Sequence, residues 1–126
     1  MKNKIVGFEI PASDFQKVSE FYGTVFDWKI KSCGDQGAMA YTTVVDKEEN
    51  PTELGGINGG FYKRQSGDES PSLIVETESI DKTLKAIESG GGKVITPKHS
   101  VDECGFMADF ADPEGNVLSL WQRQAT

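Results

Sequence analysis

The 126-residue sequence has few of the side chains that most often hold transition metals or crosslink a chain. It contains one histidine, His99, and two cysteines, Cys33 and Cys104, which lie far apart and outside any Cys-x-x-Cys motif. Cysteine-rich zinc sites and thiol redox motifs need closely spaced cysteines. We therefore expect reduced thiols and neither of these two kinds of site.

Positive charge is scarce as well. The 13 Lys and Arg residues are outnumbered by 20 Asp and Glu residues, which gives a formal net charge of −7. Binding to nucleic acid or to an anionic membrane surface needs a basic patch, so we expect neither partner. No apolar run approaches the roughly 18 residues of a membrane span, and Met1 is not followed by the apolar segment of a signal peptide. These absences predict a cytoplasmic protein.

The length and composition fit a single domain over residues 1–126, and its first half begins with a predicted strand and helix. Residues 5–12 alternate apolar and other side chains, as a half-buried strand does. Ser13 and Gln16 fit a capping box, so we expect a helix from there to about Val25. Further strands are predicted at residues 28–32, 39–45 and 54–62.

The second half repeats this order of elements. Residues 72–77 are a predicted strand, Ser79 can cap a helix over residues 80–89, and the glycines at 90–92 end that helix. The remaining expected elements are a strand at 93–96, a loop to Cys104, a strand at 106–111, a turn at 112–115 and a strand at 117–121.

A shift of 65 residues superposes the two halves, because Phe15 then falls on Ile80 and Tyr41 on Phe106. Such a repeat predicts two paired modules, at about residues 1–64 and 70–126. The alternative is chance agreement between two ordinary strand-helix-strand patterns.

Several motifs appear in a fixed order along the chain. They are Phe-Glu-Ile-Pro-Ala-Ser-Asp at residues 8–14, Ser-Ile-Asp at 79–81, Gly-Gly-Lys-Val at 91–94, Asp-Pro-Glu-Gly-Asn at 112–116 and Leu-Trp-Gln at 120–122. Together they resemble the vicinal oxygen chelate superfamily of glyoxalase I, bleomycin-resistance proteins and extradiol dioxygenases, in particular its bacterial branch related to lactoylglutathione lyase. The resemblance implies an α+β fold of two βαβββ modules, whose curled mixed sheet surrounds a cleft with helices on the outside. It also implies a homodimer.

The resemblance further implies positions for a divalent metal, which enzymes of this family hold with His, Gln or Glu side chains. In this sequence those positions fall at Gly7, Ser72 and Ser119 and near Asn58. Glycine has no ligating side chain, and a neutral hydroxyl is a weak ligand beside imidazole or carboxylate. We therefore expect no metal cofactor and no glyoxalase reaction of the usual kind.

Glu9 is the candidate catalytic residue, because it lies two residues from Gly7 on the same strand face, toward the implied cleft. Loss of solvation on a half-buried strand tends to raise the pKa of a carboxyl group toward the range of a general base. The alternative is an ion pair or a hydrogen bond to a backbone amide. A rearranged metal site would combine Glu9 with His99.

Three interpretations of function remain open. The first is a small-molecule-binding protein of the glyoxalase/bleomycin-resistance type without the usual metal. The alternative is a metal-dependent lyase or isomerase with a rearranged site around Glu9, and in a third the cleft is filled by the protein's own side chains. Trp121 can stack on a flat ligand, or it can plug the barrel mouth or pack in a dimer contact. Asn58 can donate to a ligand or occupy a turn or bulge. The candidate ligand-binding residues are Glu9, Tyr41, Asn58, Ser72, Ser119 and Trp121.

Overall fold

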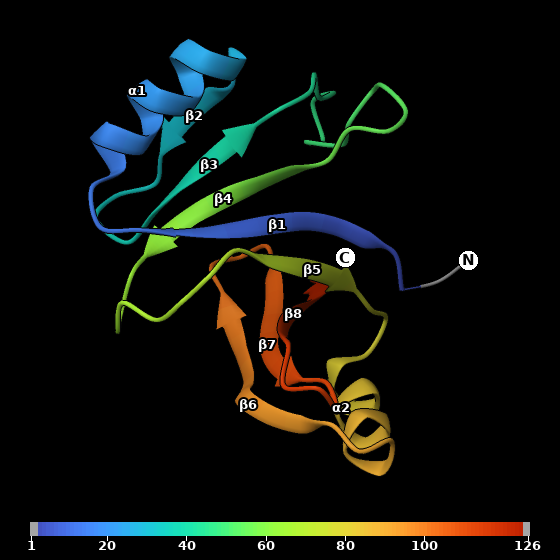
Figure 1. Cartoon of the computed structure of the whole chain (residues 1–126). Coiled ribbons are helices and arrows are strands. Elements are labelled where there is room, and N and C mark those ends of the chain that lie inside the picture. Colours follow the sequence, from blue (N-terminus) through green and yellow to red (C-terminus); the bar gives the residue numbers. More distant parts are fainter. Residues whose placement is uncertain (1–2, 125–126) are drawn as a thin grey trace. The chain divides into compact units, whose positions relative to one another are not determined.

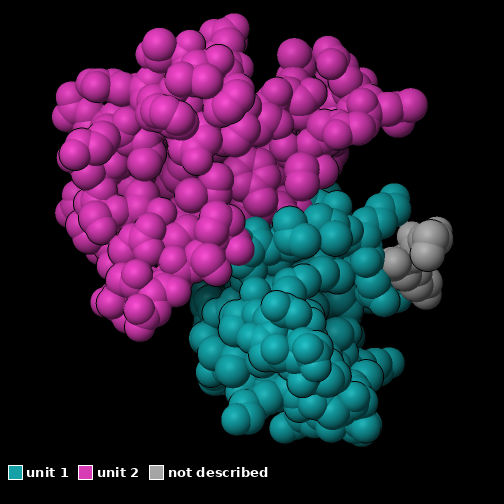
Figure 2. Space-filling view, in the orientation of Figure 1, with its two compact units in different colours: residues 1–6, 72–126 teal, residues 7–71 magenta. Residues whose placement is uncertain are grey.

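The structure, a computed structural model, describes residues 3–124 and divides into two compact units (Figure 2). The N-terminal module is Gly7–Pro71, and the C-terminal module combines residues 3–6 with residues 72–124 of the described chain. Within residues 3–124 the elements follow the order β-α-β-β-β twice (Figure 1). The α+β class and the two βαβββ modules are therefore confirmed. The cleft between them stays a prediction.

The N-terminal module builds a sheet in the strand order β2-β3-β4-β1. Strands β1 and β4 are parallel, whereas β4 and β2 both run antiparallel to β3. The elements of this module are β1 (Ile5–Ala12, of which the first two residues belong to the other unit), α1 (Phe15–Phe26), β2 (Lys29–Ser32), β3 (Gly37–Tyr41) and β4 (Asn58–Lys63).

The C-terminal module repeats this arrangement in the order β5-β8-β7-β6, with β5 parallel to β8 and the other pairs antiparallel. Lys4, immediately before β1, accepts a hydrogen bond at its carbonyl oxygen from the Glu76 N–H (2.8 Å). The elements are β5 (Ser72–Glu76), α2 (Ile80–Ser89), β6 (Lys93–Val101), β7 (Gly105–Ala111) and β8 (Val117–Arg123). No helix among residues 3–124 is long and apolar enough to cross a membrane.

Each helix covers one face of its own sheet. In the N-terminal module the buried residues Ala38, Ala40 and Phe61 lie among Phe8, Ile10 and side chains of α1. In the C-terminal module the buried centre is Ile80, Ala108 and Leu120. Because side chains alternate along a strand, the intervening residues point to the opposite side, which we call the helix-free face of each module.

Of the two helix N-caps predicted from the sequence, one is confirmed and the other is wrong. Ser79 caps α2 as predicted, because its side chain accepts a hydrogen bond from the Lys82 N–H at 3.2 Å. The predicted Ser13 cap of α1 is wrong. Asp14 takes that position, and its Oδ1 accepts from the Lys17 N–H at 3.0 Å. Aspartate is at least as good a cap as serine, so the capping box spacing was one residue off.

The predicted loop after residue 96 is also wrong, because β6 continues to Val101 through Pro97. Among the described strands β6 lies at the edge and pairs only with β7, so the missing N–H of Pro97 costs no ladder bond on its outer side. Register shifts on both sides of Thr96 accommodate the proline. An edge position therefore allows a strand where the sequence alone indicates a break.

The turn at residues 112–115 forms as predicted. Asp112 Oδ1 accepts hydrogen bonds from the N–H groups of Glu114 and Asn116, both at 2.9 Å. The Asn116 side chain donates to Asp112 Oδ2, also at 2.9 Å. That side-chain bond, followed by the backbone N–H groups, holds the pKa of Asp112 below its usual value. The turn residues thus act structurally and hold β7 beside β8.

The side chain of Gln122, in β8, caps the start of α2 in the C-terminal module. Its Oε1 accepts a hydrogen bond of 2.8 Å from the Ile80 N–H, one of the amide groups at the start of α2 that has no partner within the helix. Ile80 is fully buried, so water cannot replace this acceptor. The glutamine of the Leu-Trp-Gln motif therefore has a structural role.

We predict that Gln122→Ala lowers the free energy of unfolding by about 1 kcal/mol, the usual cost of removing a cap. Urea unfolding measures the change. Gln124→Ala, two residues further on and exposed, is the matched control and should leave the midpoint unchanged. Equal midpoints for the two variants would contradict this role of Gln122.

Candidate functional site

The helix-free face of the N-terminal module brings two of the implied metal positions together. In the parallel pair of β1 and β4, Gly7 is the register partner of Asn58, and Glu9 is the partner of Gly60. All four residues lie opposite the α1 core, because Phe8 and Phe61 beside them pack toward the helix. Asn58 is thus a strand residue, and not part of the turn that the sequence also allowed.

Asn58 holds the chain that follows β3. Its Oδ1 accepts hydrogen bonds from the N–H groups of Thr42 (2.7 Å) and Thr43 (3.0 Å). Strand β3 was predicted to continue to residue 45 but ends at Tyr41, since the next two N–H groups bond to this side chain and not to a strand. Both partners are donors, which fixes the amide with its oxygen toward the loop.

The same amide leaves a donor without an acceptor. Asn58 Nδ2 is buried and has no hydrogen-bond partner among residues 3–124. A buried polar group left unpaired costs about 1–3 kcal/mol. The amide cannot rotate to relieve this cost, because rotation would lose both threonine N–H bonds. The Nδ2 group therefore offers a fixed, desolvated donor to any oxygen that reaches it.

The other two predicted residues of this module, Glu9 and Tyr41, also lie on its helix-free face. Tyr41 follows the core residue Ala40 and is half-buried. Burial first, then a hydrogen bond to Glu49 and its negative charge, raise the pKa of Tyr41 above the usual value of 10. The hydroxyl thus stays protonated at neutral pH. Glu9 is half-buried, and its role as general base stays a prediction.

The 65-residue shift matches Tyr41 with Phe106, but the two side chains do not occupy equivalent positions. Phe106 packs against the buried core of the C-terminal module beneath α2. The 65-residue shift is correct for the helix starts, where Phe15 and Ile80 both open a helix. It puts the third strands out of phase by one residue, which turns matched side chains to opposite faces.

The helix-free face of the C-terminal module carries the remaining predicted residues. Ser72 Oγ donates a hydrogen bond of 2.8 Å to the Val117 carbonyl oxygen. Ser119 is 2% exposed, and its Oγ donates to Asp109 Oδ1 at 2.6 Å. Asp109 and Ser119 are register partners in β7 and β8.

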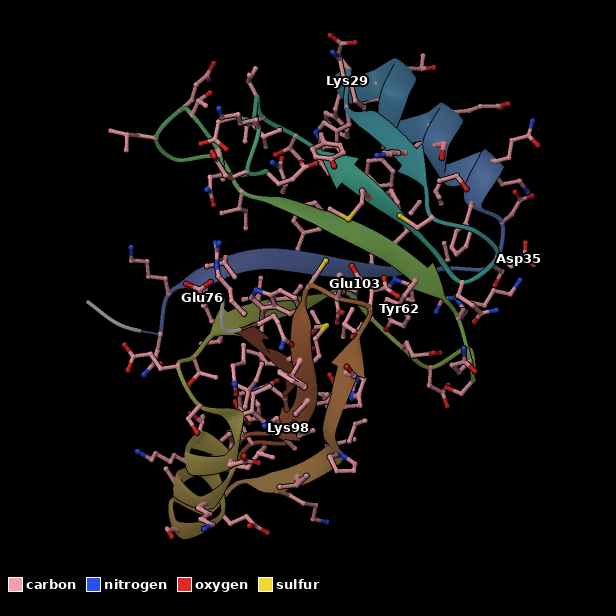
Figure 3. All side chains as sticks on the ribbon, turned by 180° about the vertical axis from the view of Figure 1, so that it is seen from behind. Lys29, Asp35, Tyr62, Glu76, Lys98 and Glu103 are labelled. Carbon is pink, nitrogen blue, oxygen red and sulfur yellow. The ribbon has the colours of Figure 1, made fainter. Side chains whose placement is uncertain are left out.

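Trp121 lies on this face next to a glycine that makes room for it. A Cβ atom on Gly105 would come within 2.9 Å of Trp121 Cη2 and 2.2 Å of the Gln122 carbonyl oxygen. The indole therefore covers the backbone of Gly105. On β5, Glu76 Oε2 accepts a hydrogen bond of 2.9 Å from Arg123 Nε (Figure 3 labels Glu76). Whether the outer ring face of Trp121 contacts a ligand stays a prediction.

The residues at the four implied metal positions do not suit a divalent cation. Gly7 has no side chain, the Ser72 and Ser119 hydroxyls donate to other oxygens, and Asn58 Oδ1 already accepts two N–H bonds. Divalent cations need several oxygen or imidazole donors directed at one point. Within residues 3–124 no group of three or more His, Cys, Asp and Glu side chains is close enough to hold an ion. His99 is exposed, with Nδ1 3.1 Å from the Pro97 carbonyl oxygen.

Sequence reasoning missed Asp109. The signal was present, since Phe106, Ala108 and Phe110 alternate with Met107 and Asp109 in a predicted strand. Once the apolar set is assigned to the core, the carboxylate must lie on the helix-free face. Its pairing with Ser119 depends on the β7–β8 register, which follows from the turn at residues 112–115.

Comparison with known families agrees with this architecture. Residues 4–120 match the model of the Glyoxalase/Bleomycin resistance protein/Dioxygenase superfamily. The chain belongs to this superfamily, so the resemblance carried by its motifs is confirmed.

Two relatives illustrate the range of the family in sequence. Anthracycline biosynthesis protein DnrV from Streptomyces peucetius is 26% identical over 125 residues, which are 92% of this chain and 46% of that protein. The chain thus spans about half the length of this relative. A glyoxylase-like domain-containing protein from Didymella fabae is 28% identical over 131 residues, covering 98% of this chain and 96% of the relative.

Two solved structures share the fold. A methylmalonyl-CoA epimerase variant from Streptomyces coelicolor, in complex with 2-nitronate-propionyl-CoA, has a TM-score of 0.69 at 14% identity, covering 99% of this chain and 100% of that one. A superfamily member from Vibrio splendidus 12B01 has a TM-score of 0.61 at 10% identity, covering 96% and 99%. At these identities the likeness shows the fold alone.

We predict that Asn58→Ala lowers the free energy of unfolding by about 1–3 kcal/mol, because the N–H groups of Thr42 and Thr43 lose their acceptor. Asn58→Asp keeps an oxygen at that point and should cost clearly less. Urea unfolding of both variants measures the difference. The loop-anchoring role is wrong if the aspartate variant is as unstable as the alanine variant.

Proposed function

We propose that the chain is a small-molecule-binding protein of the glyoxalase/bleomycin-resistance type that contacts its ligand through side chains and not through a divalent metal. The observation that carries this proposal is the buried Asn58 Nδ2 group without an acceptor on the helix-free face of the N-terminal module. Family members place a metal near this position. Here a fixed N–H donor takes its place and fits a ligand oxygen.

The donor defines the class of ligand. A neutral amide N–H held in a desolvated position binds a carbonyl or carboxylate oxygen well, since the hydrogen bond no longer competes with water. The structural neighbour from Streptomyces coelicolor is an epimerase of methylmalonyl-CoA, a thioester, and the curated relative DnrV is named for anthracycline biosynthesis. The thioester named for the structural neighbour supports a carbonyl-bearing ligand for this chain.

A metal-dependent lyase or isomerase centred on Glu9 is the second candidate. It is favoured by the position of Glu9, which is half-buried on the same face as Asn58 and opposite Gly60, a residue without a side chain. In this case Glu9 would move a proton at the ligand carbon next to the carbonyl group. Glu9→Gln would then abolish turnover, whereas unchanged ligand affinity and pH dependence in this variant would remove Glu9 from the site.

The proposal includes a cytoplasmic homodimer. Three large apolar side chains of α1 are more than half exposed, namely Phe21 (55%), Val25 (55%) and Phe26 (56%). They form an apolar strip on a helix whose other side covers the sheet. Exposed apolar patches of this kind often mark protein contacts.

We predict that Ni²⁺, Zn²⁺ and Mn²⁺ in excess leave the melting temperature unchanged, because the oxygen donors at the family's metal positions already take part in hydrogen bonds. Thermal unfolding with each ion, against a chelator-treated sample, provides the measurement. Elemental analysis of protein purified without chelator is the second readout. A stoichiometric divalent ion in that analysis would overturn the metal-free proposal.

We also predict that a carbonyl ligand raises the melting temperature of the wild type and not that of Asn58→Asp. At about 100 times Kd, binding adds about 2.7 kcal/mol of stability. The probes are S-lactoylglutathione and methylmalonyl-CoA, both thioesters. Asn58→Asp is the matched variant, since it keeps the acceptor for the loop but replaces the donor with a second acceptor. Equal shifts for the two proteins, or none with either probe, would count against Asn58 as the ligand donor.

A further inference from the structure

We propose that Asp109, held by Ser119, is a second ligand-binding residue, which accepts a hydrogen bond from an N–H or O–H group of an apolar ring system. The inference rests on the proposed small-molecule function. It concerns the C-terminal module only and does not depend on Asn58.

The pair is held rigidly. Ser119 Oγ donates to Asp109 Oδ1 at 2.6 Å, a length typical of a hydroxyl bound to a charged carboxylate. Ser119 is 2% exposed, so its hydroxyl does not exchange this partner for bulk water. The register pairing of β7 with β8 sets the two Cα atoms opposite each other. One carboxylate oxygen of Asp109 is thereby fixed, which orients the other.

The other oxygen, Asp109 Oδ2, has no hydrogen-bond or ion-pair partner among residues 3–124. Two positively charged side chains of this module are paired with other carboxylates. Arg123 binds Glu76, and Lys98 binds Asp81 at 3.2 Å. Asp109 is half-buried, and a carboxylate oxygen partly removed from water gains strongly from a donor. A bound molecule can supply that donor.

A comparison inside the chain argues against a purely structural pair. Ser72 satisfies its hydroxyl with the Val117 carbonyl oxygen, on the same helix-free face and without any charged group. The half-buried Ser72 therefore has a hydrogen-bond partner without a carboxylate beside it. Only one of the two carboxylate oxygens of Asp109 is hydrogen-bonded to Ser119. Packing of the strands alone does not require the negative charge that this residue adds.

The surroundings of the pair define the ligand. Met107 and Ala111 lie two residues to either side of Asp109 in β7, and Ile74 is the register partner of Ser119 in β5. Trp121 pairs with Met107 one step along the same face. The carboxylate thus has apolar side chains on either side of it along β7 and on β5, while its register partner in β6 is Thr96. Such surroundings fit a flat apolar molecule with one N–H or O–H group at its edge, such as a heteroaromatic ring.

The test uses indole and 1-methylindole, which share a ring system but differ in the N–H donor. Saturation-transfer and chemical-shift titrations by NMR give the two Kd values for the wild type and for Asp109→Asn. We expect the wild type to bind indole at least about tenfold more tightly, the factor for about 1.4 kcal/mol and the lower end for a hydrogen bond to a charged group. Asp109→Asn should lose that preference, because its amide keeps Oδ1 for Ser119 and turns an NH₂ group toward the ligand.

The outcomes separate this inference from the role of Asn58. Asn58→Asp should keep the preference for indole, and Asp109→Asn should keep the thermal shift with the thioester probes. If Asp109→Asn does not fold, Asp109→Ser replaces it, and the same loss of preference is expected. Equal affinity of the wild type for the two indoles, no binding of either, or a preference that survives removal of the carboxylate would overturn the inference.

Discussion

One helix per module can bury only one face of a four-stranded sheet, and this limit shapes everything else in the molecule. The alternation of side chains along each strand then sorts residues into two sets. Phe8, Ile10 and Phe61 pack beneath α1, and Val75, Ala108 and Leu120 pack beneath α2. Their immediate neighbours must point the other way. The helix-free faces collect the polar residues of the candidate site for this reason.

Two polar side chains on these faces, Asn58 and Asp109, use only part of their hydrogen-bonding capacity within the described protein. Asn58 uses its oxygen to hold Thr42 and Thr43, and its NH₂ group is left buried. Asp109 uses one oxygen for Ser119 and keeps the other available. In each case a hydrogen bond within the protein fixes the orientation of the side chain, and its other polar atom is available to a ligand. A bond of this kind pre-organises the group for a ligand, so less conformational entropy is lost on binding.

The sequence predicted those parts of the fold that depend on local chemistry. Alternation identified β1, the Ser79 side chain identified the start of α2, and the Asp112 turn identified the β7–β8 hairpin. The motifs identified the superfamily, which the family model confirms. These features depend on residues a few positions apart, where spacing alone carries the information.

Apart from the cap of α1, which is a local error of one residue, the errors share one cause: long-range contacts overrule local patterns. Strand β3 ends early because Asn58, 16 residues after Thr42, takes the next N–H. Pro97 stays in a strand because β6 lies at an edge. Asp109 was overlooked because its partner Ser119 is found only through the register. The roles of Glu9, Tyr41 and Trp121 in binding depend on contacts with a ligand and stay predictions.

Anomalous diffraction tests the central claim most directly, namely that side-chain donors replace the family's metal. Crystals would be soaked with nickel chloride together with S-lactoylglutathione, and data collected at the nickel edge. The account predicts a ligand oxygen at about 2.7–3.2 Å from Asn58 Nδ2, with no anomalous peak near Gly7, Ser72 or Ser119. A nickel ion within bonding distance of any of these four positions would contradict it.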